Sequence, residues 1–207
     1  MENTIEVPVS KRISAYLMDI LLIFIMISLI IEIKFINPNY DEYVESYEKY
    51  NDVIDDYNNE LITEEELVKL NTENYYAISK YSVSYNIVIV VGLILYFVVF
   101  QKFTGGQTLG KKLMKIKVVN NNNEKPTLFK LFLRCLPVYY IYIGGIIPVF
   151  INTILIYIIS PNNYMSISNI VSYIFLIISI ISFIILWIRK DKRGLHELIS
   201  DTKVIYE

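Results

Sequence analysis

Apolar residues in this chain are gathered into four long runs that polar segments separate. The runs cover about residues 13–36, 85–103, 136–160 and 167–188. Because about 20 consecutive apolar residues cross the hydrocarbon core of a bilayer as an α-helix, we predict four transmembrane helices. Gly144, Gly145 and Pro148 interrupt the third run, but glycine and proline are tolerated in spanning helices. We therefore expect one kinked helix there rather than two segments.

Composition supports the same class of protein. Of the 207 residues, 54% are hydrophobic, and the mean hydropathy is +0.43, well above that of ordinary soluble domains. The sequence therefore predicts an all-α membrane protein that forms a single membrane domain over residues 1–207 and contacts the lipid bilayer.

Lysine and arginine are distributed unevenly between the polar segments. The loop at 104–135 contains seven of them and one acid, Glu124, and the tail at 189–207 opens with RKDKR. Because positive charges close to spanning helices are retained on the inner side, we predict that this loop, the tail and both termini are cytoplasmic. This topology is consistent with four spans in the cell membrane, and it places the insert at 37–80 outside.

The insert at 37–80 carries twelve acidic residues and three lysines. Its apolar and aromatic residues nevertheless alternate at spacings of four and three, which predicts a seam along one helix face. The seam comprises Ile36, Tyr40, Tyr43, Tyr47, Tyr50, Ile54, Tyr57 and Leu61. We predict an external acidic helical hairpin, whose first helix begins at Asn37 and Pro38. Its second helix is expected to begin with a capping box formed by Thr63 and Glu66.

Two uses of this seam stay open. In one, the aromatic face packs between the two arms of the hairpin. In the other, it docks a partner or contacts the outer lipid headgroups.

Two short segments on the predicted cytoplasmic side have the composition of β-strands. Residues 115–119 and 202–206 are rich in β-branched side chains that alternate with lysine or other polar residues. We predict that they pair as a small cytoplasmic β-ribbon. The nearby glycines do not indicate a phosphate-binding loop, because Lys112 stands where that motif requires serine or threonine.

One charged residue lies well inside the first apolar run. An ionised carboxylate near hydrocarbon costs about 2.5–3.5 kcal/mol, so Asp19 is expected to face protein or water. Arg12 precedes it by seven residues, which places both on one helix face about 10.5 Å apart along the axis. That distance is too long for a direct pair, so a third group is needed. Because the tail returns to the same side, we predict that Glu197 contacts Arg12 and that His196 or a backbone donor approaches Asp19.

Three segments of the chain carry distinctive motifs. They are KRISAYLMDILL, GGQTLGKKLMKIKVVN with the downstream Arg134, and KRGLHELISDTKV. Together they resemble the RDD family of small bacterial membrane proteins, whose first spanning helix has an arginine at its start and an aspartate within it. Arg12 and Asp19 match these two positions. In the closing motif, Glu197 stands where the family has aspartate, and Asp201 stands where it has glycine.

The resemblance implies a multi-pass membrane protein from a family in which most members have no assigned activity. Exchange of sodium or lithium ions for protons has been ascribed within the family. This implies one candidate function, an exchanger with Asp19 as the ion or proton site and Arg12, Glu197 and His196 beside it. The alternative is a non-enzymatic membrane accessory or assembly protein, in which Arg12, Asp19 and Glu197 are structural.

Other functional classes are not supported by the sequence. We expect no enzyme, because the chain lacks a nucleophile with a neighbouring base and lacks a metal-ligating cluster. We also expect no cofactor and no nucleic-acid partner. The expected partners besides lipid are a second copy of the chain or another membrane protein, and a monovalent cation, for which Asn152 and Thr153 are the nearest neutral ligands.

Overall fold

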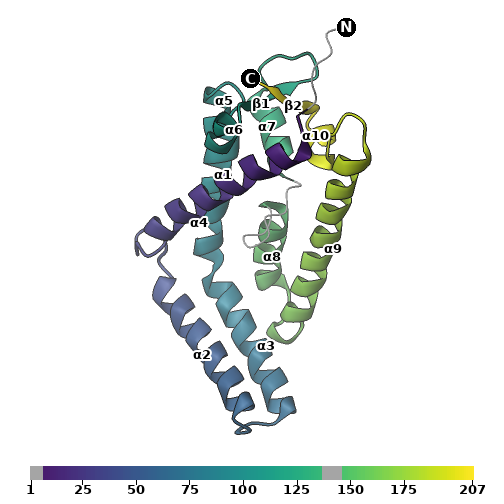
Figure 1. Cartoon of the computed structure of the whole chain (residues 1–207). Helices are drawn as coiled ribbons and strands as arrows, with labels where there is room; N and C mark the ends of the chain where they lie inside the picture. Colours follow the sequence, from purple (N-terminus) through teal and green to yellow (C-terminus); the bar gives the residue numbers. More distant parts are fainter. Residues whose placement is uncertain (1–6, 137–145) are drawn as a thin grey trace.

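The computed structural model describes residues 7–136 and 146–207. This part of the chain is mostly helical, with a two-stranded sheet at one end (Figure 1). Within residues 7–136 and 146–207, three stretches are long and apolar enough to cross a membrane, in agreement with the prediction of a helical membrane protein. They are α1 (Val9–Ile30), the stretch Val83–Phe103 formed by α4 (Val83–Ile94), η1 (Leu95–Phe100) and α5 (Gln101–Phe103), and α9 (Pro161–Ile188).

Two of these helices differ from their predicted boundaries. Helix α1 ends at Ile30 rather than at residue 36, because the backbone turns there and the amide of Ile33 bonds to the carbonyl of Ile30 at 3.2 Å. Helix α9 begins at Pro161 rather than at residue 167. Proline is well suited to the first turn of a helix, since its missing N–H is not needed there.

The predicted third span is described only in part. Residues 137–145 lie outside the described residues, so the choice between one kinked helix and two segments stays a prediction. The described part, α8 (Ile146–Ile158), has 13 residues. A helix of that length is about 20 Å long, shorter than a hydrocarbon core of about 30 Å. A fourth crossing, and the side on which the termini lie, stay predictions as well.

A helical hairpin of α2 (Tyr40–Asn58) and α3 (Glu64–Tyr81) connects α1 to α4 (Figure 1). The predicted capping box at the start of α3 is confirmed. The Thr63 hydroxyl accepts a hydrogen bond from the Glu66 amide at 3.3 Å, and the Glu66 carboxylate accepts one from the Thr63 amide at 2.9 Å. That the hairpin is external stays a prediction.

The start of α2 and its packed face differ from the prediction. Asn37 does not begin the helix; its side chain is fully buried and accepts a hydrogen bond from the Ser84 hydroxyl at 2.5 Å. On α2, Ser46 is buried, whereas Tyr47 and Tyr57 are 50% and 39% exposed. A straight helix has 3.6 residues per turn, so a seam with a strict seven-residue repeat drifts off the packed face. The predicted seam therefore packs only in part.

The remaining short elements form a folded unit, here called the cap, at the end of the molecule away from the hairpin (Figure 1). The cap consists of α6 (Leu109–Leu113), β1 (Ile116–Asn120), α7 (Leu128–Cys135), α10 (Leu195–Ile199) and β2 (Thr202–Tyr206). Strands β1 and β2 pair antiparallel, with Val118 opposite Val204, so the predicted ribbon is confirmed with its first strand one residue later.

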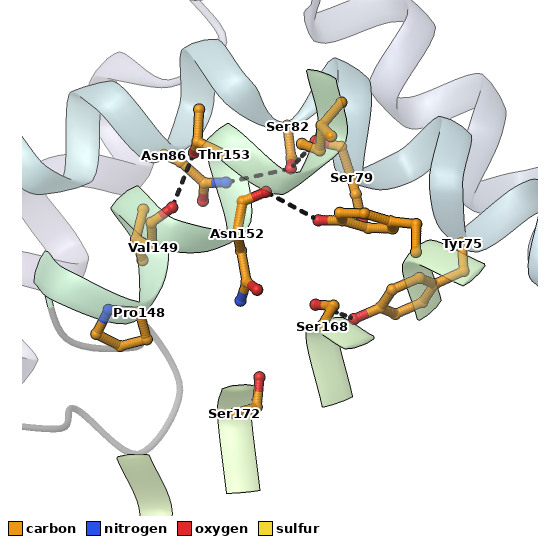
Figure 2. Close-up of a pocket in the computed structure, with 12 residues that line it drawn as sticks. Tyr75, Ser79, Ser82, Asn86, Pro148, Val149, Asn152, Thr153, Ser168 and Ser172 are labelled. Carbon is orange, nitrogen blue, oxygen red and sulfur yellow. Dashed lines mark hydrogen bonds between the residues drawn. The ribbon is translucent and has the colours of Figure 1, made fainter. Parts of the chain in front are cut away.

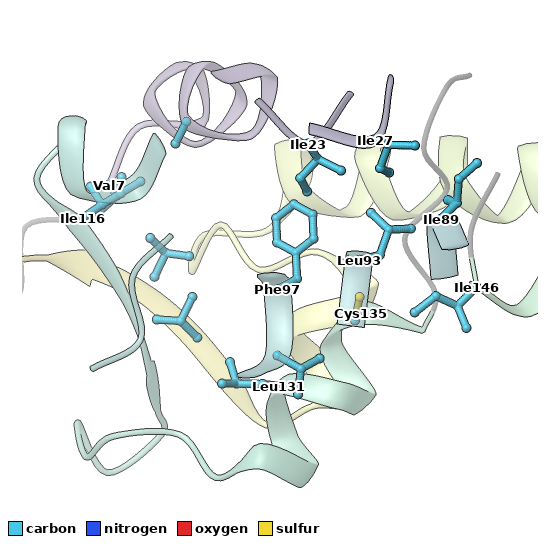
Figure 3. Close-up of a cluster of buried hydrophobic side chains, with 14 residues drawn as sticks. Val7, Ile23, Ile27, Ile89, Leu93, Phe97, Ile116, Leu131, Cys135 and Ile146 are labelled. Atoms are coloured by element: carbon cyan, nitrogen blue, oxygen red, sulfur yellow. The ribbon is translucent and has the colours of Figure 1, made fainter. Parts of the chain in front are cut away.

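One cluster of buried apolar side chains extends from the cap into the spanning helices (Figure 3). At the cap end it contains Ile116 and Leu131, and it continues through Phe97 to Ile23 and Leu93. Full burial of a large apolar side chain stabilises a fold by about 1.5–3 kcal/mol. The cap and the spanning helices therefore share one core rather than folding as separate units.

Candidate functional site

The carboxylate of Asp19, on α1, is fully buried and accepts three hydrogen bonds. The Tyr96 hydroxyl lies 2.6 Å from Oδ1, the Thr108 hydroxyl 2.5 Å from Oδ2, and the Gly110 amide 2.7 Å from Oδ1. Hydrogen bonds to an ionised group are roughly twice as strong as neutral ones. Asp19 therefore ties a spanning helix to two other parts of the chain, the η1 turn and the loop that enters the cap.

The local structure explains how these donors reach Asp19. Tyr96 lies in η1, a π-helical turn, and such turns are frequently found at functional sites. Thr108 is the N-cap of α6, so its oxygen accepts from the Lys111 amide at 3.3 Å while its hydroxyl donates to Asp19. Gly110 allows α6 to lie directly against α1, since a Cβ there would come within 2.1 Å of the Ala15 carbonyl oxygen.

Replacing Gly110 with alanine is expected to destabilise the fold by about 1–3 kcal/mol or more, as overpacked sites do. The added Cβ would also lie 2.9 Å from Cγ of Asp19, so α6 must move away from α1. The unfolding midpoint of the purified protein in detergent measures the effect. Gly92→Ala is the matched control, because its Cβ would meet Ile27 at an ordinary 3.7 Å. Equal midpoints for the two variants would contradict the close approach at Gly110.

Lys111 faces the same carboxylate. Its Nζ lies 3.8 Å from Oδ2 of Asp19 and 3.2 Å from the Thr108 hydroxyl oxygen. Burial lowers the pKa of Lys111 to about 8, while the charge of Asp19 opposes that shift. A lysine with such a pKa loses its proton much closer to neutral pH than an exposed lysine does.

A second buried carboxylate lies on α10. Glu197 is 1% exposed, and the guanidinium groups of Arg12 and Arg134 donate to it at 3.2 Å and 3.1 Å. The Gly194 amide adds a hydrogen bond of 2.9 Å. The predicted contact between Arg12 and Glu197 is therefore confirmed. Burial alone would raise the pKa of Glu197, but the positive charges of Arg134 and Arg12 hold this pKa below its ordinary value.

Both arginines also bind the backbone or side chains of the tail. Arg12 donates to the Lys192 carbonyl at 2.5 Å, and Arg134 donates to the Thr202 hydroxyl at 2.9 Å. Thr202 is the first residue of β2, so Arg134 links α7 to both the helix and the strand of the tail. We call the two carboxylates and their side-chain and backbone partners the joint. It comprises Arg12, Asp19, Tyr96, Thr108, Gly110, Lys111, Arg134, Gly194 and Glu197.

The prediction that His196 or a backbone donor approaches Asp19 is confirmed for the backbone donor. The backbone donor is present, but it belongs to Gly110 and not to the tail, and His196 is not among the groups that bond to Asp19 in the described chain. Burial, together with Arg134, lowers the pKa of His196 to about 3, so its imidazole is neutral. Asn152 and Thr153, the expected neutral ligands, lie instead at a separate cavity between other helices.

Sequence reasoning missed four members of the joint as partners of the two carboxylates: Tyr96, Thr108, Lys111 and Arg134. Tyr96 carries a hydroxyl within an apolar run, which is a weak signal that it donates to a buried group. Thr108 lies shortly before a glycine and two lysines, but this pattern does not indicate that its hydroxyl bonds to Asp19. Their positions depend on the packing of α1, η1 and α6, which no local pattern specifies.

These features define the class of protein: a multi-pass helical membrane protein whose short polar elements form a cap fixed to its first spanning helix by two buried carboxylates. The RDD family profile matches residues 7–201, nearly the whole chain, and the chain belongs to the RDD family. No curated protein and no solved structure matches it.

Proposed function

We propose that the chain is a non-enzymatic membrane accessory or assembly protein, in which the joint holds the cap in a fixed position on the spanning helices. The proposal rests on the complete burial of Asp19. Its side chain has no exposed surface, and both carboxylate oxygens accept hydrogen bonds. An ion that binds and leaves would have to displace one of these donors in every cycle, whereas a permanent contact would not.

The arrangement at Glu197 supports the same proposal. A carboxylate between two arginines offers no free position to a cation, and the positive charges of Arg12 and Arg134 would repel one. Removing one partner of such a buried pair costs about 3–5 kcal/mol, because the other charge is left uncompensated. Glu197 is therefore suited to fix the tail to α1 and α7.

A cap that is held in place offers a defined surface to a partner. Lys112, Lys115 and Lys125 of the cap are exposed, and so are the apolar side chains of Leu113 and Phe129, at 68% and 67%. A surface that combines basic and large apolar side chains is suited to contacts at the membrane interface. We propose that the partner is another membrane protein, which binds this side of the chain in the cytoplasm.

One observation favours the second candidate, exchange of sodium or lithium ions for protons. Lys111 has a pKa of about 8 and lies 3.8 Å from Asp19, so loss of its proton would leave the carboxylate without a counter-charge. The oxygens of Tyr96 and Thr108 beside Asp19 are of the kind that bind hard cations. In this candidate, a cation would occupy the position of the lysine charge.

Ion flux into proteoliposomes distinguishes the two candidates. Our proposal predicts that sodium or lithium gradients cause no proton movement above that of empty liposomes, at pH values on both sides of the pKa of Lys111. Flux that is lost in Asp19→Asn and in Lys111→Met, while both variants keep their fold, would contradict the proposal and support exchange. Flux that persists in both variants would contradict the accessory role. It would also contradict exchange at Asp19.

A positive test of the accessory role uses crosslinking in intact membranes. A photo-reactive residue at Phe129 of the cap is expected to capture a defined membrane protein. Glu197→Gln, which loosens the cap, is expected to reduce that capture. A reactive residue at Ile170 of α9, which is 57% exposed, is not expected to capture the same protein. Equal capture at both positions would contradict a specific contact through the cap.

A further inference from the structure

A polar cavity lies among the helices on the hairpin side of the molecule, away from the joint. It has a volume of about 170 Å³ and is formed by residues of α3, α4, α8 and α9 together with Ser82, the residue between α3 and α4. Figure 2 shows the side chains of Asn152, Ser168 and Ser172 converging on the same space from α8 and α9. Asp19 and its partners are not among the residues that line it.

The lining is polar but carries no charge. Of the twelve described lining residues, seven have hydroxyl groups and two, Asn86 and Asn152, have amides, while the other three are apolar. No acidic or basic side chain is found among these twelve. Desolvating an ion is costly unless an opposite charge compensates it, so the cavity is poorly suited to a cation or an anion. Its hydroxyl and amide groups both donate and accept hydrogen bonds, as an uncharged polar ligand requires.

One acceptor in the cavity has no partner. The side-chain oxygen of Asn152 is buried and forms no hydrogen bond within the described chain. An unsatisfied buried polar atom is unfavourable, so such atoms usually have a partner that is water or a ligand. The nearby hydrogen bonds are long: Tyr75 and Ser168 are 3.4 Å apart, and the Tyr164 hydroxyl is 3.4 Å from the Asn152 carbonyl. These groups can therefore turn toward a ligand at little cost.

The volume limits the size of the ligand. Pockets for drug-sized molecules measure about 300–1,000 Å³, so this cavity holds a solute of only a few heavy atoms. Water occupies about 30 Å³ per molecule in the liquid, so a few water molecules are the competing occupant. The rings of Tyr75 and Tyr164, whose centroids are 6.0 Å apart, add apolar surface that suits the carbon atoms of a small organic solute better than water.

We propose that this cavity is a binding site for a small uncharged solute that carries hydroxyl groups, of the size of glycerol. One hydroxyl of the solute donates to the unpartnered oxygen of Asn152. Its other hydroxyl groups exchange hydrogen bonds with Ser168 and Ser172, and its carbon atoms contact Tyr75 and Tyr164. The site is independent of the joint, so it does not depend on the proposed accessory role or on ion exchange.

Saturation-transfer NMR on the full chain in phosphatidylcholine nanodiscs tests the proposal, with glycerol as the probe. The wild-type protein is expected to transfer saturation to glycerol protons, whereas empty nanodiscs are not. Ser172→Leu fills the cavity and is expected to reduce the signal to that of empty nanodiscs. Ser172 forms no hydrogen bond among the described residues, so the fold is expected to survive. Ser166→Leu, at an exposed position on the same helix, is the matched control and keeps the signal.

A second pair of variants tests the role of the unpartnered amide. Asn152→Leu is expected to lose the glycerol signal, whereas Asn71→Leu keeps it, because Asn71 has a similarly buried, unpartnered oxygen but does not line the cavity. Acetate and methylammonium, which are charged probes of similar size, are expected to give no signal. The proposal is overturned by an unchanged glycerol signal in Ser172→Leu, by charged probes that bind as glycerol does, or by no glycerol signal in the wild type, which would mean that the cavity holds water only.

Discussion

Replacing Asp19 with alanine is expected to lower the free energy of unfolding by about 3–5 kcal/mol, which is a large part of the 5–15 kcal/mol that typically stabilises a fold. The change leaves the Tyr96 and Thr108 hydroxyls and the Gly110 amide without their acceptor, and it leaves Lys111 without its counter-charge. Each of these groups is costly to leave unsatisfied in a buried position. Titration of the purified protein with a denaturing detergent, followed by circular dichroism, measures the loss.

Two further variants make this test specific. Asp19→Asn keeps the shape of the side chain and one acceptor, so its free energy of unfolding is expected to fall less than that of Asp19→Ala. Met18→Ala changes a neighbouring side chain that is 41% exposed, and it is expected to cost less than about 1 kcal/mol. A similarly small loss in Asp19→Ala would contradict the role of Asp19 as a fixed contact.

Glu197→Gln is expected to lower the free energy of unfolding by about 3–5 kcal/mol, as Asp19→Ala does, because it leaves two buried arginines without their negative partner. Arg12 and Arg134 lie 3.2 Å and 3.1 Å from this carboxylate, and their side chains are only 11% and 13% exposed. The same detergent titration measures the effect. Asp201→Asn is the matched control, since Asp201 pairs with Lys130 but is 54% exposed, and exposed pairs contribute little to stability.

Exchanging the charges of Arg12 and Glu197 tests whether these two residues form an isolated ion pair or a triad with Arg134. The double variant Arg12→Glu with Glu197→Arg is expected to remain as unstable as either single variant, because Arg134 would then face a second positive charge. Recovery of stability in the double variant would show that Arg134 contributes little, and it would contradict the triad.

The sequence predicted much of the fold because several elements depend on local patterns. The apolar runs, the capping box of Thr63 and Glu66 and the strand alternation at 202–206 each depend on residues that are close in the chain. Asn37 shows where this approach fails. Its position before a proline suits a helix start, but its amide oxygen forms a tertiary contact with Ser84, which lies 47 residues further along the chain.

The joint was predictable only in part, for a similar reason. The contact between Arg12 and Glu197 follows from opposite charges that lie at the same end of the molecule, and the sequence indicated both. The donors to Asp19 come from Tyr96, 77 residues away, and from Thr108 and Gly110, 89 and 91 residues away. A π-helical turn and a close helix approach bring them together, and neither has a reliable sequence signal.

Hydrogen exchange of the cap tests the central claim most directly, because the joint is proposed to fix the cap as one unit to α1. Mass spectrometry would compare the wild type with Asp19→Asn in nanodiscs. The claim predicts that amides in α6, β1 and β2 lose protection together, while those of the hairpin, α2 and α3, do not change. Unchanged protection in β1 and β2, or loss confined to Gly110 and its neighbours, would contradict it.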